Sequence, residues 1–137
     1  MMRRYAGWVL AGLLLVFVSL SLYQYQVNRT HHEHIDSLIN VCIADAKDSF
    51  SDYLRSPSRE SYLFAVSSFH TFTKLYPESS YYDSEFFRVI SQAYAKLLFD
   101  ASLDEENLQA LVEALEFWEK DCSDIRGCTS LQTFLSA

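Results

Sequence analysis

The chain has 137 residues, of which 50% are hydrophobic and 21% are charged, so it is not an intrinsically disordered sequence. It contains 11 Lys and Arg against 18 Asp and Glu, and its formal net charge of −7 argues against nucleic acid as a partner. With 3 Gly and 2 Pro it has too few turn residues for a β-sandwich or for a glycine-rich nucleotide cradle. Its length suits one ordinary domain.

The N-terminal region differs in charge from the rest of the chain. Residues 1–29 contain three basic residues, Arg3, Arg4 and Arg29, and no acidic residue. The run over 6–23 has no charge, and as a helix it would be about 27 Å long, close to the roughly 30 Å hydrocarbon core of a bilayer. We therefore expect a single transmembrane helix over 6–23, which makes the lipid bilayer a partner of this segment.

Residues beside this run predict its orientation. Trp8 and Tyr23 stand near its two ends, where aromatic rings settle at membrane interfaces, and Arg3 and Arg4 precede it. The positive-inside rule then predicts a cytoplasmic tip and a juxtamembrane linker within residues 1–29, and an extracytoplasmic domain over 30–137. A cleaved secretory signal is the alternative. The small residues Gly7 and Ala11, four apart, could let two such helices pack as a homo-oligomer.

The rest of the chain predicts helices, because apolar residues recur at spacings of three and four and no glycine occurs between Gly12 and Gly127. The first helix is expected to begin at Thr30, with Glu33 at capping-box spacing, and to end before Ser56-Pro57. The second is expected to begin at Pro57 and to stop at Tyr76-Pro77. Buried stripes are predicted on these helices at Ile35, Leu38, Ile39, Cys42, Ala46, Phe50 and Tyr53, and at Tyr62, Ala65, Val66, Phe69, Phe72 and Leu75.

Two further helices and a short final one complete the predicted fold. The third is expected to start near Ser80, with Asp83 three residues later, and the fourth at Ser102 with Glu105. A loop that Gly127 could close precedes a short helix over 129–137. The inward stripes are Phe86, Phe87, Ile90, Ala93, Tyr94, Leu97 and Leu98, then Leu108, Leu111, Val112, Leu115 and Trp118, then Leu131, Phe134 and Leu135. Together they predict an all-α bundle of four to five helices arranged as antiparallel hairpins.

One stretch carries a family resemblance. The second helix reads Ala65-x3-Phe69-x2-Phe72-x4-Pro77, and the third reads Phe87-x2-Ile90-Ser91-x2-Tyr94. These patterns resemble the second and first helices of a tetratricopeptide repeat over about residues 58–98. Phe72 departs from the family pattern, which has a small residue there. The resemblance implies a protein-binding groove without catalytic residues, while a plain four-helix bundle explains the same stripes.

Two groups of side chains could bind a metal ion or form a disulfide bond. On a helix, His31 and His34 share a face and could contribute two ligands to a metal ion, but two histidines make a poor site, and a solvated neck is the favoured interpretation. Cys122 and Cys128 bracket five residues, a spacing that predicts a small disulfide loop outside the cytoplasm, with free thiols as the alternative.

Three tyrosines near the predicted turn, Tyr76, Tyr81 and Tyr82, could form an exposed aromatic patch that anchors a partner, or could cover the end of the bundle. The chain shows no P-loop, dinucleotide fingerprint, nucleophile elbow or HExxH motif, so we expect neither an enzyme nor a cofactor. The sequence therefore favours a membrane-anchored scaffold that binds another protein of a bacterial-type envelope. An extracytoplasmic sensor that binds a small ligand or a metal is the alternative.

Overall fold

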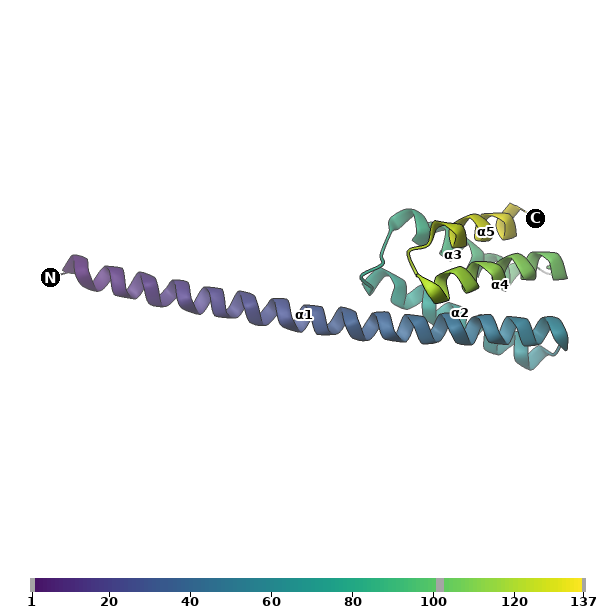
Figure 1. Cartoon of the computed structure of the whole chain (residues 1–137), viewed down its shortest axis with the longest axis horizontal. Helices are drawn as coiled ribbons and strands as arrows, with labels where there is room; N and C mark the ends of the chain where they lie inside the picture. Colours follow the sequence, from purple (N-terminus) through teal and green to yellow (C-terminus); the bar gives the residue numbers. More distant parts are fainter. Residues whose placement is uncertain (1, 101–102, 137) are drawn as a thin grey trace. The chain divides into compact units, whose positions relative to one another are not determined.

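The computed structural model of the chain describes residues 2–100 and 103–136, with side chains from Gly12 onward. Over these residues the chain forms five α-helices and one 3₁₀ turn (Figure 1): α1 (Met2–Arg55), α2 (Arg59–Leu75), η1 (Tyr76–Glu78), α3 (Ser84–Phe99), α4 (Glu105–Lys120) and α5 (Ile125–Ser136). The prediction of an all-α bundle is confirmed. The chain divides into two compact units, residues 1–34 and 35–137, and each is described by itself.

The predicted transmembrane helix is contradicted. Among the residues that the structure describes, no helix holds an apolar stretch long enough to cross a bilayer, so the prediction of a span over 6–23 is wrong, together with the single-pass localisation. The side chains of Arg3, Arg4 and Trp8, like Gly7 and Ala11, lie outside the described part.

The helix start predicted at Thr30 is also absent, because α1 continues through this residue. No Gly or Pro interrupts the chain between residues 13 and 56, so nothing breaks the helix there. The Thr30 hydroxyl donates to the carbonyl oxygen of Gln26 at 3.0 Å instead of capping a new helix. Glu33 accepts a hydrogen bond from Arg29, one turn earlier, at 2.8 Å.

The other helix starts are set by side-chain caps that the sequence analysis partly misplaced. Ser58, not Pro57, caps α2 and accepts from the amide of Ser61 at 3.1 Å. Asp83, not Ser80, caps α3, and Asp104 caps α4 by accepting from the amide of Asn107 at 2.9 Å. Ser102 lies outside the described residues. Helix α5 begins at Ile125 and so contains Gly127, which does not close a loop before it.

One hydrophobic core fills residues 35–137. Its members largely follow the predicted stripes: Ile35, Ile39, Ala46, Phe50, Ala65, Val66, Phe69, Phe72, Ile90, Ala93, Leu97, Leu108, Leu111, Val112, Leu115, Trp118, Leu131 and Phe134 are buried. Eight other predicted core residues are half-buried and pack against this core: Cys42, Tyr53, Tyr62, Leu75, Phe86, Phe87, Tyr94 and Leu135. Two predicted core residues are exposed: Leu38 by 38% and Leu98 by 48%. Both lie at the edge of the buried stripe of their helix, where a shift of one position turns a side chain toward solvent.

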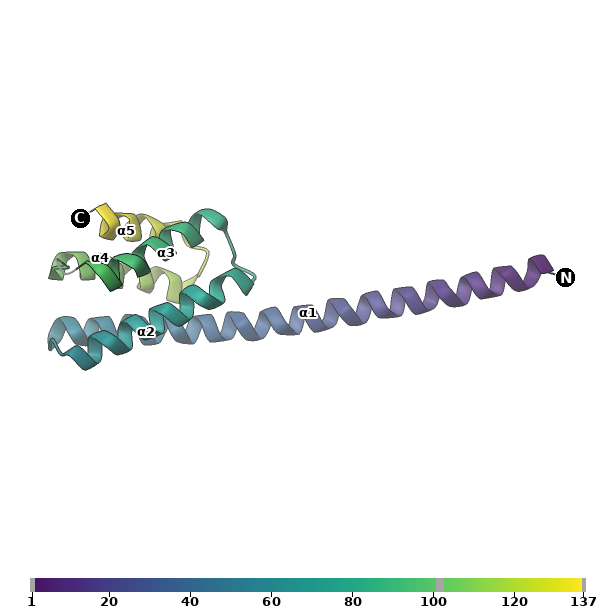
Figure 2. The same ribbon diagram turned by 180° about the vertical axis from the view of Figure 1, so that it is seen from behind.

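Side-chain contacts fix the order of the helices in this unit (Figure 2). The rings of Phe50 and Tyr53 on α1 contact that of Tyr62 on α2, at centroid distances of 6.3 and 5.3 Å. Helix α2 packs against α3, and α5 packs against α4 and α3. The Lys96 ammonium of α3 donates to the carbonyl oxygen of Phe134 in the last turn of α5 at 2.8 Å, which satisfies a carbonyl that the helix itself leaves open.

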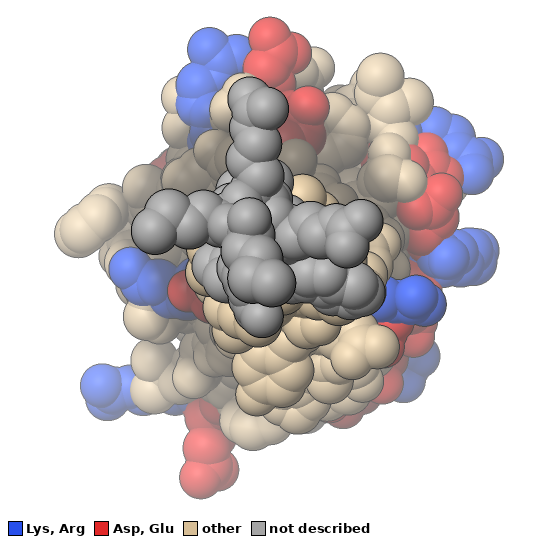
Figure 3. All heavy atoms as spheres, turned by 90° about the vertical axis from the view of Figure 1, so that its left-hand side faces the viewer, with Lys and Arg blue, Asp and Glu red and all other residues tan. Residues whose placement is uncertain are grey.

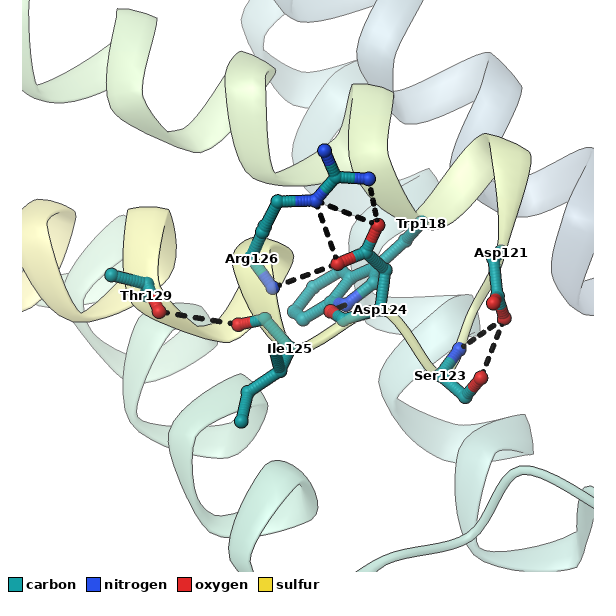
Figure 4. A network of polar contacts seen from close by, with 7 residues as sticks. All are labelled: Trp118, Asp121, Ser123, Asp124, Ile125, Arg126 and Thr129. Atoms are coloured by element: carbon teal, nitrogen blue, oxygen red, sulfur yellow. Dashed lines mark hydrogen bonds and ion pairs between the residues drawn. The ribbon is translucent and has the colours of Figure 1, made fainter.

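The turn between α4 and α5 is held by its own polar network (Figure 4). The Trp118 indole N–H donates to the carbonyl oxygen of Asp124 at 3.2 Å. The Asp124 carboxylate pairs with the Arg126 guanidinium at 2.6 Å, and hydrogen bonding to Arg126 lowers the pKa of Asp124. Asp121 accepts from the amide and the hydroxyl of Ser123, and the hydroxyl bond is the larger cause of its lowered pKa. These contacts fix the conformation of the turn between α4 and α5.

Candidate functional site

The predicted metal ligands do not form a site in the described residues. His31 and His34 lie on α1, but no group of three or more His, Cys, Asp or Glu side chains that could hold a metal ion occurs in the described part of the chain. The nearest ring contact of His31 is with His32, at a centroid distance of 6.2 Å. Two histidines without a third ligand make a poor metal site, so the geometry does not favour the metal-sensor alternative.

The predicted tyrosine patch is mostly an internal cluster. Tyr76 is 1% exposed, and its hydroxyl donates to the carbonyl oxygen of Tyr81 at 2.9 Å. Its ring stacks on Phe87 at 6.5 Å and meets Tyr82 edge-on at 6.1 Å. Burial raises the pKa of Tyr76 well above its ordinary value. Tyr81 is half-buried against the core, and only Tyr82, which is 49% exposed, remains available to a partner.

This tyrosine cluster is tied to α1 by Asp36. One carboxylate oxygen of Asp36 accepts from the amide of Ser80 at 3.0 Å, and the other accepts from the Ser80 hydroxyl at 2.5 Å. The two residues are 44 positions apart, so these bonds anchor the α2–α3 loop to the bundle. The three tyrosines thus cover one end of the bundle, which is the structural alternative that the sequence analysis left open.

The predicted disulfide is not formed in the structure. Cys122 and Cys128 are free cysteines, 3% and 5% exposed, at the end of α4 and within α5. Burial raises the pKa of the Cys122 thiol to about 12 and that of Cys128 to about 11, with nearby carboxylates as smaller causes. Both are therefore protonated core residues at neutral pH, and α5 is held to α4 by packing and by the turn network.

Large exposed apolar side chains occur where α2 begins and α3 ends. Tyr62 donates from its hydroxyl to the carbonyl oxygen of Leu97 at 2.8 Å, which joins these two helix ends, and the two ends lie at the same end of the bundle in Figure 2. Each of them carries two large exposed apolar side chains directly after the hydrogen-bonded residue. We call these side chains the junction patch: Leu63 and Phe64 on α2, 55% and 58% exposed, and Leu98 and Phe99 on α3, 48% and 85% exposed.

A hollow of about 310 Å³ lies beside the junction patch. It is lined by two tyrosines of the α1–α2 hairpin and by the end of α3 with the chain that follows it: Tyr53, Tyr62, Leu97, Leu98, Phe99, Asp100, Leu103 and Leu108. The rings of Tyr53 and Tyr62 are tilted at 56° to each other, and burial raises the pKa of Tyr62. The lining of this recess exposes more polar than apolar surface, so it suits a side chain that combines an apolar body with a hydrogen-bonding group.

Sequence reasoning missed this patch. Leu63 and Phe64 stand beside the predicted stripe of α2 and were not assigned to any face, while Leu98 was predicted to be buried. The available signal was the run of four consecutive apolar residues over 63–66, because four successive positions span about 300° of a helix and cannot all face one core.

Other exposed apolar residues of this unit are scattered. Tyr82 and Ile125 stand singly on the α2–α3 loop and on α5, and Leu38 and Val41 form a pair three positions apart on α1. On the face shown in Figure 3, acidic and basic side chains are interspersed, and no large area of one charge is visible. Neither feature points to a strongly charged partner on that face.

No protein-family model, curated protein or solved structure matches this chain.

Proposed function

We propose that residues 35–137 form a non-catalytic protein-binding module, and that the junction patch is the surface that holds the partner. The observation that carries this proposal is that the Tyr62–Leu97 hydrogen bond joins two helix ends, each of which carries a pair of large exposed apolar side chains: Leu63 and Phe64 on α2, and Leu98 and Phe99 on α3. A clustered patch of large apolar side chains, two of them aromatic, is typical of an interaction site, whereas single exposed residues are not.

The partner is expected to present an apolar or aromatic side chain. The hollow beside the patch, with a volume of about 310 Å³, would receive it between Tyr62 and Phe99. The Tyr62 hydroxyl is already used by Leu97, so the recess is preformed by a bond within the domain. A preformed recess favours binding because little conformational entropy is lost when the partner docks.

The helical-repeat resemblance supports the same class of function. Tyr62 contacts Leu97 and His70 stacks on Tyr94 at 4.7 Å, so residue numbers rise along α2 as they fall along α3. This antiparallel packing of α2 against α3 is the arrangement that consecutive tetratricopeptide-type helices would adopt. It supports a protein-binding role and names no partner.

A small-ligand module is the second candidate, and the same hollow favours it. Its volume of about 310 Å³ lies at the lower end of the range of ligand pockets, roughly 300–1,000 Å³. The two candidates differ in what covers Phe99, which is 85% exposed. A ligand inside the hollow would leave the outward patch bare, whereas a protein partner would cover it.

Site-specific photocrosslinking tests the proposal. A benzophenone amino acid placed at Phe99 in cells that express the chain is expected to yield a discrete protein adduct. The same group at Ile125, which is 69% exposed on α5, is the matched control and is expected to yield none. An adduct with the same protein from both positions, or none from Phe99, would contradict the proposal.

A further inference from the structure

The N-terminal unit presents an apolar helix surface that nothing in the described chain covers. Between Gly12 and Asn28 no residue is charged, and every large apolar side chain from Leu13 to Val27 is at least 45% exposed. The two serines of this stretch do not make the surface polar. Ser19 and Ser21 donate their hydroxyls to the carbonyl oxygens of Leu15 and Phe17 at 2.8 and 2.9 Å, within the same helix.

One row of this surface has the spacing of a helix–helix contact. Its members alternate at intervals of three and four: Leu13, Val16, Leu20, Tyr23 and Val27, which are 64%, 58%, 57%, 66% and 52% exposed. We call this row the seam. Apolar residues at alternating three- and four-residue intervals form the contact stripe of paired α-helices, in which each side chain enters a gap on the facing helix.

A second row offers a natural comparison. Leu15, Val18, Leu22 and Tyr25 repeat the residue types of the first four seam positions two residues later, and they are 69%, 45%, 60% and 69% exposed. We call this the offset row. Its next position is Arg29, which pairs with Glu33 at 2.8 Å, so the row ends in a charge. The seam continues to Val27, and it is therefore the longer uninterrupted apolar row.

The occupant that fits the seam is a second copy of this chain. Five seam side chains, each about half or more exposed, would bury roughly 1,000 Å² over two copies, which reaches the lower limit for a specific interface. The absence of charge from Gly12 to Asn28 lets two such helices approach without repulsion. We propose that the chain self-associates through the seam, with Leu20 at the centre of the contact.

Charge elsewhere predicts how this association depends on salt. The charged residues that precede residue 35 are Arg3, Arg4, Arg29 and Glu33. The 35–137 unit therefore holds 8 of the 11 basic residues and 17 of the 18 acidic residues, which gives it a net charge of −9. Two copies of this unit repel each other at low ionic strength, and salt screens that repulsion. Association through an uncharged seam should therefore strengthen as salt is added.

Sedimentation velocity of the full-length chain over a range of concentrations tests the proposal. We expect a monomer–dimer equilibrium that Leu20→Gln weakens at least about tenfold, the change that corresponds to about 1.4 kcal/mol. Leu22→Gln, in the offset row, is the matched control and should weaken it far less. Circular dichroism of both variants checks that the helix is retained. Because glutamine is introduced in each variant, any change in helix propensity affects both alike.

Three results would overturn the proposal. The first is a monomer at every concentration, and the second is equal loss of association in Leu20→Gln and Leu22→Gln. The third is a chain that enters phosphatidylcholine vesicles as a monomer and does not associate in their absence, which would make lipid the occupant of this surface. The proposal concerns residues 13–27 alone, so it can fail without affecting the function proposed for residues 35–137.

Discussion

Gly127 lies directly against the indole ring of Trp118. A Cβ atom at Gly127 would stand 2.6 Å from Cε2 and 2.7 Å from Cδ1 of that ring, closer than real Cβ contacts allow. The backbone of Gly127 has an ordinary negative φ, so glycine is needed here for space rather than for conformation. This close approach lets α5 pack on α4 while the Trp118 N–H bonds to Asp124.

Gly127→Ala should therefore destabilise the 35–137 unit by about 2 kcal/mol, because the added methyl group overpacks a buried contact whose ring is held by a hydrogen bond. Urea unfolding followed by Trp fluorescence measures the change. Gly12→Ala is the matched control, since a Cβ there meets nothing within 4 Å. An equal effect of both substitutions would show that helix propensity, not contact with Trp118, governs the change.

Asp36→Ala should lower the free energy of unfolding by about 1–3 kcal/mol, because it removes two hydrogen bonds to Ser80 that anchor the α2–α3 loop. Asp45→Ala on the exposed side of the same helix is the control and should have little effect. Chemical denaturation of both variants gives the comparison. Equal stability of Asp36→Ala and the parent chain would contradict the anchoring role.

The domain should lose stability at alkaline pH. Burial raises the pKa of Cys122 from 9.0 to about 12, so the folded chain keeps this proton where the unfolded chain loses it. The resulting stabilisation is complete below pH 9 and is lost as the pH rises from 9 toward 12. The urea concentration at the midpoint of unfolding should fall as the pH is raised from 7 to 9 and 10.5. This fall should be less steep in Cys122→Ala than in Cys42→Ala. Midpoints that do not change with pH would contradict the buried thiol.

Much of the helical architecture follows from the sequence because its causes are local. Helix α1 ends directly before Ser56-Pro57, the α-helical hydrogen bonding of α2 gives way to a 3₁₀ turn at Tyr76-Pro77, and the apolar stripes of α2 and α4 face one core. The cap residues were harder to place. A threonine one turn after Gln26 can cap a new helix or bond back to the helix it is in, and Thr30 does the second.

The candidate site could not be predicted in the same way, because burial at helix ends depends on residues far apart in the sequence. The ring of Tyr76 stacks on Phe87 of α3, and the loop between them is anchored by the Asp36–Ser80 contact, which spans 44 positions and which the local sequence does not reveal. Leu98 is exposed because the junction of α2 and α3 brings Leu97, rather than its neighbour, into the core.

Substitutions in the junction patch should separate binding from stability. Phe99→Ser removes a ring that is 85% exposed, so it should leave the urea midpoint nearly unchanged while weakening capture of the crosslinked partner at least about tenfold. Ile125→Ser, on α5, should change neither quantity. Unchanged partner capture by a folded Phe99→Ser chain would show that the partner does not contact this ring.

Carbene footprinting in cells tests the central claim most directly. A diazirine reagent labels exposed side chains of the purified chain, and the account predicts labelling of Leu63, Phe64, Leu98 and Phe99 in that sample. In cells the bound partner should protect these four residues, while Ile125 should be labelled equally in both samples. Equal labelling of the junction patch in cells and in the purified chain would contradict its role as the partner-binding surface.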